Sequence, residues 1–265
     1  MSLYSIYFSP TGGTKKVMDI LSDEWKENEL VEEIDLSNAD CDFSEYTMTK
    51  EDICLFGVPS FGGRVPGVIL ERIAQMKNEG AMAIPVIVYG NRAYDDTMFE
   101  LKEGLESNSF HVKAAIAAVA EHSIMHQFAK GRPDKKDETE LREFVRKIKE
   151  TLKAEKISLA EGSMQERKAL LVPGKKPYRE YNGVPFKPKA NRKCVKCGIC
   201  VEKCPVQAIP KENPVSVDEQ KCISCMRCIQ ICPHKARRLN KIMLFMASQG
   251  MKRVCSGRKS NELYL

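Results

Sequence analysis

Two runs of cysteines in the last third of the chain carry the strongest chemical signal. Each run reads Cys-x2-Cys-x2-Cys-x3-Cys-Pro, and the second follows the first at an offset of 28 residues. Three thiolates two residues apart wrap a cube from one loop, and in iron-sulfur runs of this spacing the fourth cysteine ligates the other cluster. The sequence therefore predicts two [4Fe-4S] clusters. The first takes Cys194, Cys197, Cys200 and Cys232, and the second takes Cys222, Cys225, Cys228 and Cys204.

A pair of zinc sites is the alternative, because four cysteines also hold Zn²⁺ tetrahedrally. Zinc ribbons pair two Cys-x2-Cys units across a long gap, however, and that is not the pattern here. Three cysteines remain, and Cys54 is interpreted as a small buried residue, with no role expected for Cys41 or Cys255. Eleven cysteines without a disulfide framework indicate metal or redox chemistry in a reducing compartment, and we expect a cytoplasmic protein.

A second signal lies near the N-terminus, where a loop rich in hydroxyls and glycines separates a strand from a helix. Backbone N–H groups and the helix dipole make such a position an anion site. The loop lacks both the GxxxxGK[ST] and the GxGxxG patterns of nucleotide-binding loops. Without an obligatory lysine it suits a monophosphate such as that of FMN, although an ordinary helix N-cap is the alternative. The candidate phosphate ligands are Ser9, Thr11, Gly12, Gly13 and Thr14.

Two further loops follow the third and fourth expected strands. Ligands of open α/β sheets bind beyond the carboxyl ends of the strands, so these loops should converge on the phosphate loop. Phe61 and Tyr94 are placed to flank a flat isoalloxazine ring, and backbone N–H groups near the glycines can bond its pyrimidine edge. Packing of both rings under their loops is the alternative. The full candidate set is Pro59, Ser60, Phe61, Gly62, Gly63, Gly90, Asn91, Arg92, Tyr94, Asp95 and Asp96.

The elements that must position these loops alternate between apolar runs and helical patterns. Strands buried on both sides and separated by helices predict an open parallel sheet, in an α/β fold of the doubly wound, five-stranded type. The expected strands are 3–8, 31–36, 52–58, 83–89 and 112–119, and the expected helices are 14–27, 68–76, 97–107 and 138–152. We divide the chain into a sheet domain (1–155), a linker (156–187), a cluster domain (188–238) and a C-terminal helix and tail (239–265).

The charge is distributed unevenly along the chain. Residues 1–155 hold 19 Lys and Arg against 28 Asp and Glu, whereas residues 156–265 hold 23 against 8. A basic half suggests nucleic acid or an anionic membrane as a partner. The negative charge of the cluster thiolates, however, offsets part of this positive charge. No nucleic-acid-binding module accompanies the charge, and no membrane-spanning segment is present. The apolar stripe at Met243, Leu244, Phe245, Met246 and Met251 is expected to pack between domains. His122 is expected to be structural, with a place near the flavin as the alternative.

With these motifs in place, the chain resembles the flavodoxin-ferredoxin fusions of anaerobic bacteria and archaea. The resemblance rests on SPTGGT (9–14), VPSFGGRVP (58–66), YGNRAYDD (89–96), AEHSI (120–124) and RKSNELYL (258–265) beside the cysteine runs. It implies a flavodoxin-like domain with FMN and a small α+β ferredoxin-like domain with two [4Fe-4S] clusters. Position 13 is Gly where many flavodoxins have Asn.

Together these features predict an electron-transfer flavoprotein that passes electrons between FMN and two clusters and on to redox protein partners, donor and acceptor unknown. A flavin-dependent reductase of a small organic substrate and a non-catalytic docking subunit of a larger redox complex are the alternatives, so catalysis is left undecided between carrier and oxidoreductase. Homodimerisation is left open, and neither nucleic acid nor a membrane span is expected.

Overall fold

A computed structural model describes residues 2–26, 31–160 and 169–265. Its centre is a sheet of five parallel strands in the order β2-β1-β4-β6-β8, which is the 2-1-3-4-5 order of flavodoxin-like folds. The doubly wound parallel sheet expected from the sequence is thereby confirmed. The strands are β1 (Leu3–Tyr7), β2 (Val31–Asp35), β4 (Ile53–Pro59), β6 (Met82–Tyr89) and β8 (Ala115–Val119).

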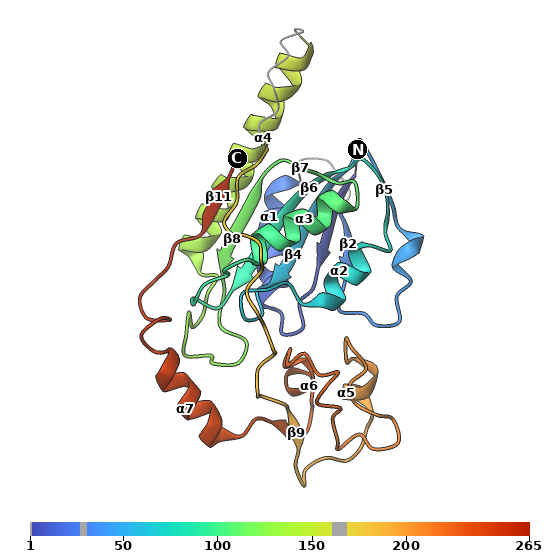
Figure 1. The fold of residues 1–265 in the computed structure, drawn as a ribbon, viewed down its shortest axis with the longest axis vertical. Coiled ribbons are helices and arrows are strands. Elements are labelled where there is room, and N and C mark those ends of the chain that lie inside the picture. Colours follow the sequence, from blue (N-terminus) through green and yellow to red (C-terminus); the bar gives the residue numbers. More distant parts are fainter. Residues whose placement is uncertain (1, 27–30, 161–168) are drawn as a thin grey trace.

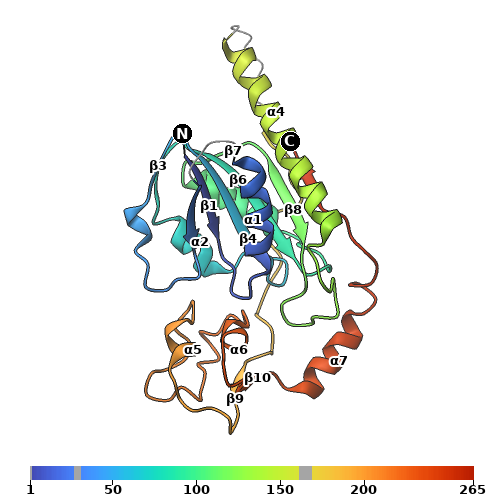
Figure 2. The same cartoon turned by 180° about the vertical axis from the view of Figure 1, so that it is seen from behind.

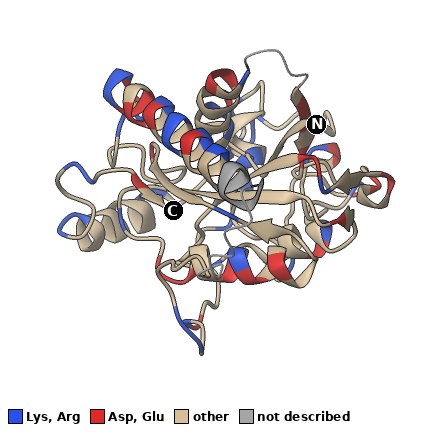
Figure 3. Ribbon diagram, turned by 90° about the horizontal axis from the view of Figure 1, so that it is seen from above, with Lys and Arg blue, Asp and Glu red and all other residues tan. Residues whose placement is uncertain are grey.

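Helices cover both faces of this sheet (Figures 1 and 2). One face packs on α1 and α4, through Val17, Leu21 and Leu141, and the other packs on α2 and α3, through Ile69 and Leu101. The strands are therefore buried on both sides, which explains their continuous apolar runs. The helices are α1 (Gly13–Trp25), α2 (Gly67–Ile73), α3 (Thr97–Ser107) and α4 (Lys135–Ala160). Basic and acidic residues are interspersed along α4 (Figure 3).

Several short elements escape the sequence patterns. The expected strand 112–119 is interrupted, because β7 (His111–Val112) pairs with β6 at its start and β8 begins only at Ala115. The short helix η1 (Phe43–Glu45) precedes β3 (Thr47–Thr49), which pairs in parallel with β5 (Lys77–Glu79). Strands of three residues are too short for an alternation of apolar and polar residues to be recognised.

The small cluster domain lies beyond the carboxyl ends of the parallel strands (Figures 1 and 2). It holds β9 (Lys189–Ala190), α5 (Ile199–Glu202), α6 (Arg227–Gln230) and β10 (Arg237–Arg238), with β9 and β10 antiparallel. Buried Arg72 of the sheet domain donates from Nη2 to the carbonyl of Pro205, at 2.6 Å, and Arg227 lies 4.0 Å from Asp35. The two domains are therefore in direct polar contact.

After the cluster domain the chain returns to the sheet. Helix α7 (Lys241–Met251) packs through Leu244 and Met251 against a cluster that includes Phe128 and Phe186, while Phe245 and Met246 on the same helix are exposed. The expected interdomain packing therefore involves only part of the stripe. The chain then forms β11 (Glu262–Tyr264), which pairs antiparallel with β8 at the edge of the sheet.

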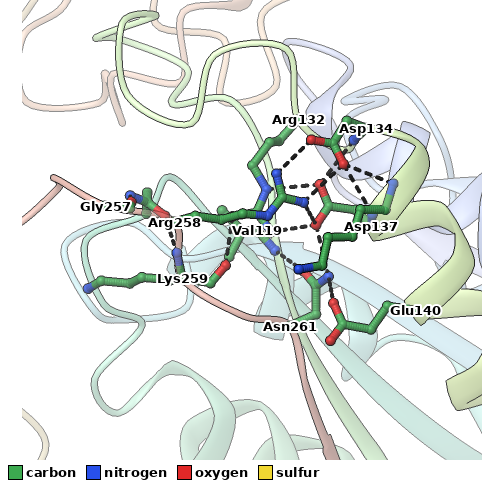
Figure 4. Close-up of polar contacts among 11 residues, drawn as sticks. Val119, Arg132, Asp134, Asp137, Glu140, Gly257, Arg258, Lys259 and Asn261 are labelled. Atoms are coloured by element: carbon green, nitrogen blue, oxygen red, sulfur yellow. Dashed lines mark hydrogen bonds and ion pairs between the residues drawn. The ribbon is translucent and has the colours of Figure 1, made fainter.

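A polar network holds this last segment (Figure 4). Asp137 has a fully buried side chain, and it accepts hydrogen bonds from Arg132, Arg258 and Asn261. Asn261 in turn accepts from the backbone N–H of Val119, at 2.9 Å. We call Arg132, Asp137, Arg258 and Asn261 the tail clamp. No helix in the described part of the chain is both long and apolar enough to cross a membrane.

Candidate flavin site and cluster sites

The loops that follow β1, β4, β6 and β8 surround a cavity of about 70 Å³ at the carboxyl edge of the sheet. Of the predicted phosphate ligands, those that line it are Ser9, Thr11, Gly13 and Thr14. The Oγ of Ser9 accepts from the backbone N–H of Lys15, at 2.8 Å, which leaves its own hydrogen to donate. The Nζ of Lys15 is paired with Asp19 and Glu33, so the loop offers an anion its hydroxyls and backbone N–H groups rather than the charge of this lysine.

A second, mainly apolar cavity of about 190 Å³ adjoins the first. The two share six lining residues: Ser60, Phe61, Tyr89, Gly90, His122 and Ser123. One end of the combined site is thus polar and at a helix N-terminus, and the other is apolar and bordered by aromatic rings. This distribution fits a phosphate at one end and a flat ring system at the other, as in FMN. Predicted residues Gly62 and Arg92 also line the apolar cavity, and Pro59 lines the polar one.

Tyr181, from the linker, covers the loop after β4. A Cβ at Gly62, which has φ +62, would lie 2.2 Å from the ring of Tyr181, so a side chain at this position is excluded. Val184, Phe186 and Met251 complete the apolar wall. Sequence patterns did not identify Tyr181, Val184 or Phe186, because the linker has no periodicity and its position over the cavity depends on long-range packing. Met251 was expected to pack between domains but was not expected at the flavin site.

His122 is a partly buried wall residue of both cavities, which supports the alternative interpretation of this histidine. Its Nδ1 accepts from the backbone N–H groups of Ile124 and Met125, at 3.1 and 3.2 Å, so the ring proton is on Nε2. Burial above all, together with the charges of His126 and Arg92, lowers the pKa of His122 to about 4. The imidazole is therefore neutral at pH 7 and has one N–H to donate.

Glu121 places a carboxylate in the wall of the polar cavity, but its oxygens are already engaged. They accept from the backbone N–H of Gly131, at 2.9 Å, and contact Nδ1 of His126, at 2.8 Å. The carboxylate therefore holds the loop after β8 in place. The loop after β8 could have been expected at the site by the same argument as the other loops. It too follows the carboxyl end of a parallel strand, where ligands of open α/β sheets bind.

Six predicted flavin ligands lie outside the walls of both cavities, namely Gly12, Gly63, Asn91, Tyr94, Asp95 and Asp96. The structure corrects Tyr94 most clearly. Its ring is in the core, 5.1 Å from that of Tyr89, and its hydroxyl lies 2.6 Å from Glu262 and from Tyr264 of β11. Burial and these contacts raise the pKa of Tyr94, which therefore stays protonated. Tyr94 is a partner of the tail and does not flank the cavity.

The other five residues make contacts outside the two cavities. Asp95 pairs with Arg92 and Arg179, and Asp96 accepts from the backbone N–H groups of Lys175 and Arg179, so both carboxylates fasten the linker. The amide of Asn91 donates to the carbonyls of Cys255 and Gly257 and thereby anchors the tail. Gly63 makes room for Asp95, and Gly12, with φ +88, is the N-cap residue that precedes α1.

The eight predicted cluster ligands fall into two spatial groups that follow the crossed assignment. Cys194, Cys197 and Cys200 line one cavity together with Cys232 of the second run. In the other group, burial raises the pKa of Cys228 to about 12, and the nearby thiols of Cys225, Cys222 and Cys204 act in the same direction. Within the described residues, no three His, Cys, Asp or Glu side chains are arranged to hold a single metal ion.

The backbone repeats with the same period as the cysteines. Left-handed φ values occur in pairs 28 residues apart, at Lys196 and Ser224 and at Gly198 and Met226. Backbone N–H groups of Ala208 and Ala236 donate to Cys204 Sγ and Cys232 Sγ, each at 3.3 Å. These turns direct successive cysteines to the same side of each loop, and the N–H···S bonds stabilise thiolate charge.

The two sites meet at Cys225, which lines the polar cavity of the flavin site. Ile223 and Ser224 line the apolar cavity beside it. The loop of the second cysteine run therefore forms a wall of the flavin site. The cavity of the other group, around Cys197, is lined only by residues of the cluster domain.

Comparison with known proteins finds one family match and several similar structures. Residues 193–236, which contain both cysteine runs, match the family described as a 4Fe-4S dicluster domain. The first domain is similar in structure to a flavodoxin from the domain Archaea (16% identity, 58% of this chain, 99% of that chain, TM-score 0.40). It is also similar to the flavodoxin of Megasphaera elsdenii (17% identity, 56% of this chain, 99% of that chain, TM-score 0.36).

A flavodoxin variant of Fusobacterium nucleatum bound to flavin mononucleotide is a third similar structure (13% identity, 57% of this chain, 96% of that chain, TM-score 0.40). No curated protein matches the chain. The chain thus joins a sheet domain with the flavodoxin strand order to a domain of the iron-sulfur dicluster type.

Proposed function

We propose that this protein is an electron-transfer flavoprotein in which FMN and two [4Fe-4S] clusters exchange electrons within one chain and with redox proteins outside it. The observation that carries the proposal is the position of Cys225 in the wall of the flavin cavity. A ligand of one cluster then borders the flavin directly. FMN accepts one or two electrons and a cluster one at a time, so the pair can collect single electrons and release them singly or together.

The side chains of this chain supply binding, orientation and exclusion of water. Ser9, Thr11 and Thr14 and the N-terminus of α1 hold the phosphate. Phe61 and Tyr181 would border the ring, and neutral His122, which lines the same cavity, has one N–H to donate, on Nε2. We also place the working protein in a reducing cytoplasm, as in anaerobic metabolism, because thiolates stay reduced there.

The contact between the domains supports transfer inside one molecule. Basic residues of the second half pair with acidic residues of the first at several points: Arg227 with Asp35, Lys176 with Glu103, Arg179 with Asp95, and Arg258 with Asp134. Most of these pairs come from the linker and the tail, so opposite charge fastens the segments that flank the cluster domain.

The composition of the holoprotein is tested first. After anaerobic reconstitution we expect about eight iron and eight sulfide per chain, with about one FMN. Stoichiometric zinc without visible absorption would contradict the cluster assignment. Flash reduction of the clusters, followed by flavin absorbance, should then give a first-order rate independent of protein concentration, whereas a rate proportional to concentration would show that the domains serve separate partners.

A matched pair of variants tests the route. Cys197 and Cys225 occupy the same position in the two runs, but only Cys225 lines the flavin cavity. Cys225→Ser should slow flavin reduction strongly, whereas Cys197→Ser should leave the transfer from the neighbouring cluster to the flavin near its normal rate. Equal effects of the two substitutions would refute the assigned order.

A role as a subunit of a larger redox complex is the second candidate. The observation that favours it is the exposed apolar face of α7, where Ile242, Phe245 and Met246 are 73%, 64% and 68% exposed. Large exposed apolar patches often mark interaction sites. Anaerobic size-exclusion chromatography with light scattering, in which Phe245→Ser shifts an assembly to smaller mass, would support this role.

A further inference from the structure

The two cysteine loops differ in what they face. In the second loop, Ile223 and Cys225 form part of the flavin-cavity walls. Their equivalents 28 residues earlier are Val195 and Cys197, and both are exposed, Val195 to 60%. One loop is thus docked against a redox cofactor site, and the repeat presents the same positions of the other loop to solvent.

The exposed loop also carries more positive charge than its repeat. Within 192–203, Arg192, Lys193, Lys196 and Lys203 are exposed and Glu202 is the single acidic residue. In the second loop the equivalents of Arg192, Lys196 and Lys203 are Gln220, Ser224 and Ile231. The second loop retains two basic residues, Lys221 and Arg227, of which Arg227 faces Asp35 of the sheet domain.

The differences indicate a requirement other than holding a cluster. Both loops carry the same ligand spacing, so the extra cations of the first are unnecessary for binding iron and sulfide. Val195 and Ile199 lie among them and are 60% and 36% exposed, giving an apolar centre with a charged rim. Interfaces between proteins have this arrangement, and charge on the rim accelerates encounter with a partner of opposite charge.

We propose that the loop 192–203 is the docking surface for an acidic one-electron carrier protein, which exchanges electrons with the cluster held by Cys194, Cys197, Cys200 and Cys232. The inference rests on the proposed function and adds the place and the charge of the partner. In each encounter the reduced carrier loses one electron and this cluster gains it, with no bond made or broken. The opposite face of the cluster domain then passes electrons to the flavin.

The test uses the anaerobic holoprotein and a reduced, acidic plant-type [2Fe-2S] ferredoxin as the probe in stopped-flow measurements. The variant is Lys193→Glu with Lys196→Glu and Lys203→Glu. The control is Lys50→Glu with Lys77→Glu and Lys153→Glu, which changes the net charge equally on the sheet domain. The neutral radical of 5-deazariboflavin serves as a small reductant that needs no docking, so equal rates with it show that all three proteins hold intact clusters.

For wild type, we expect the rate constant of cluster reduction by the ferredoxin to fall at least tenfold when the salt concentration is raised from a low value. The loop variant should be at least tenfold slower than wild type at low salt, and the control less than threefold slower. A loop variant as fast as wild type, or a control equally slow, would overturn the proposal. A wild-type rate that does not depend on salt would also overturn the proposal. If the loop lysines in that case bound vesicles of phosphatidylserine, the surface would be assigned to a membrane.

The order of reduction separates this proposal from the proposed function. If the carrier reduces the clusters rapidly and with the expected salt dependence, but the flavin in the same chain stays oxidised, the docking surface stands and transfer within the chain fails. If the flavin is reduced before the clusters, the docking surface is refuted while the flavin remains an electron acceptor.

Discussion

Removing the central carboxylate of the tail clamp should destabilise the sheet domain substantially. Asp137 is fully buried and receives 2.8 Å and 2.9 Å hydrogen bonds from Arg132 Nε and Arg258 Nη2, and another from Asn261. In Asp137→Ala the Arg132 guanidinium, whose side chain is 5% exposed, loses its carboxylate partner. Breaking a buried ion pair from one side costs about 3–5 kcal/mol. In a chain of this length that lowers the melting temperature by roughly 6–20 °C.

The single tryptophan provides the signal for this measurement. Trp25, the last residue of α1, is buried in the core cluster that also contains residues of α4, so its fluorescence reports unfolding of the sheet domain during urea denaturation. The control is Glu143→Ala on the same helix, where the pairs with Arg146 and Lys147 are exposed, and the expected change is within about 0.5 kcal/mol. A loss below about 1 kcal/mol in Asp137→Ala would refute the structural role assigned to the clamp.

The pH dependence gives a further check. Burial alone would raise the pKa of Asp137, but hydrogen bonds from Arg132, the backbone of Asp134 and Asn261 outweigh it and lower the pKa. The carboxylate therefore contributes stability above its unfolded pKa of about 3.9, and this contribution is lost as the pH falls through the folded pKa. The difference between wild type and Asp137→Ala should be constant above about pH 5 and shrink in more acidic solution.

Three further predictions concern the flavin site. Thr11→Ala with Thr14→Ala removes two hydrogen bonds to a charged phosphate, each worth roughly 1.5–3 kcal/mol, so fluorescence titration should find FMN binding weakened by at least a hundredfold, and unchanged affinity would place the phosphate elsewhere. His122 should remain neutral down to about pH 5 in histidine ¹⁵N NMR, because burial lowers its pKa to about 4, and a midpoint above pH 6 would contradict its position in the wall. Gly62→Ala should weaken FMN binding more than Gly183→Ala, since both have positive φ but only the first Cβ meets an aromatic ring, and equal effects would remove that ring from the site.

The local parts of the site were predictable from the sequence, and the parts that depend on distant segments were not. The phosphate loop carries its own signal, because hydroxyls and glycines between a strand and a helix define an anion site wherever the helix lies. The cysteine runs likewise encode their turns, as the paired left-handed residues at Lys196 and Ser224 illustrate.

The aromatic residues illustrate the opposite case. Tyr94 and Tyr181 each have a flat ring with a polar tip. Tyr94 belongs to a candidate flavin loop in the sequence, whereas Tyr181 lies near one only in the folded chain. Tyr94 is in the core because Glu262, 168 residues later, accepts a hydrogen bond from its hydroxyl. Tyr181 covers Gly62 because the linker crosses the loop there. The residues next to each tyrosine in the sequence therefore do not predict where its ring lies.

The return of the chain to β8 has a consequence for the order in which the protein is made. Residues 262–264 leave the ribosome after the whole cluster domain, and until they arrive β8, which pairs with β6 on one side, has no partner on its other side. The side-chain amide of Asn91, in the loop after β6, likewise has its hydrogen-bond acceptors only after Cys255 and Gly257 have been synthesised. The edge of the sheet domain is therefore completed only after the cluster domain has been synthesised.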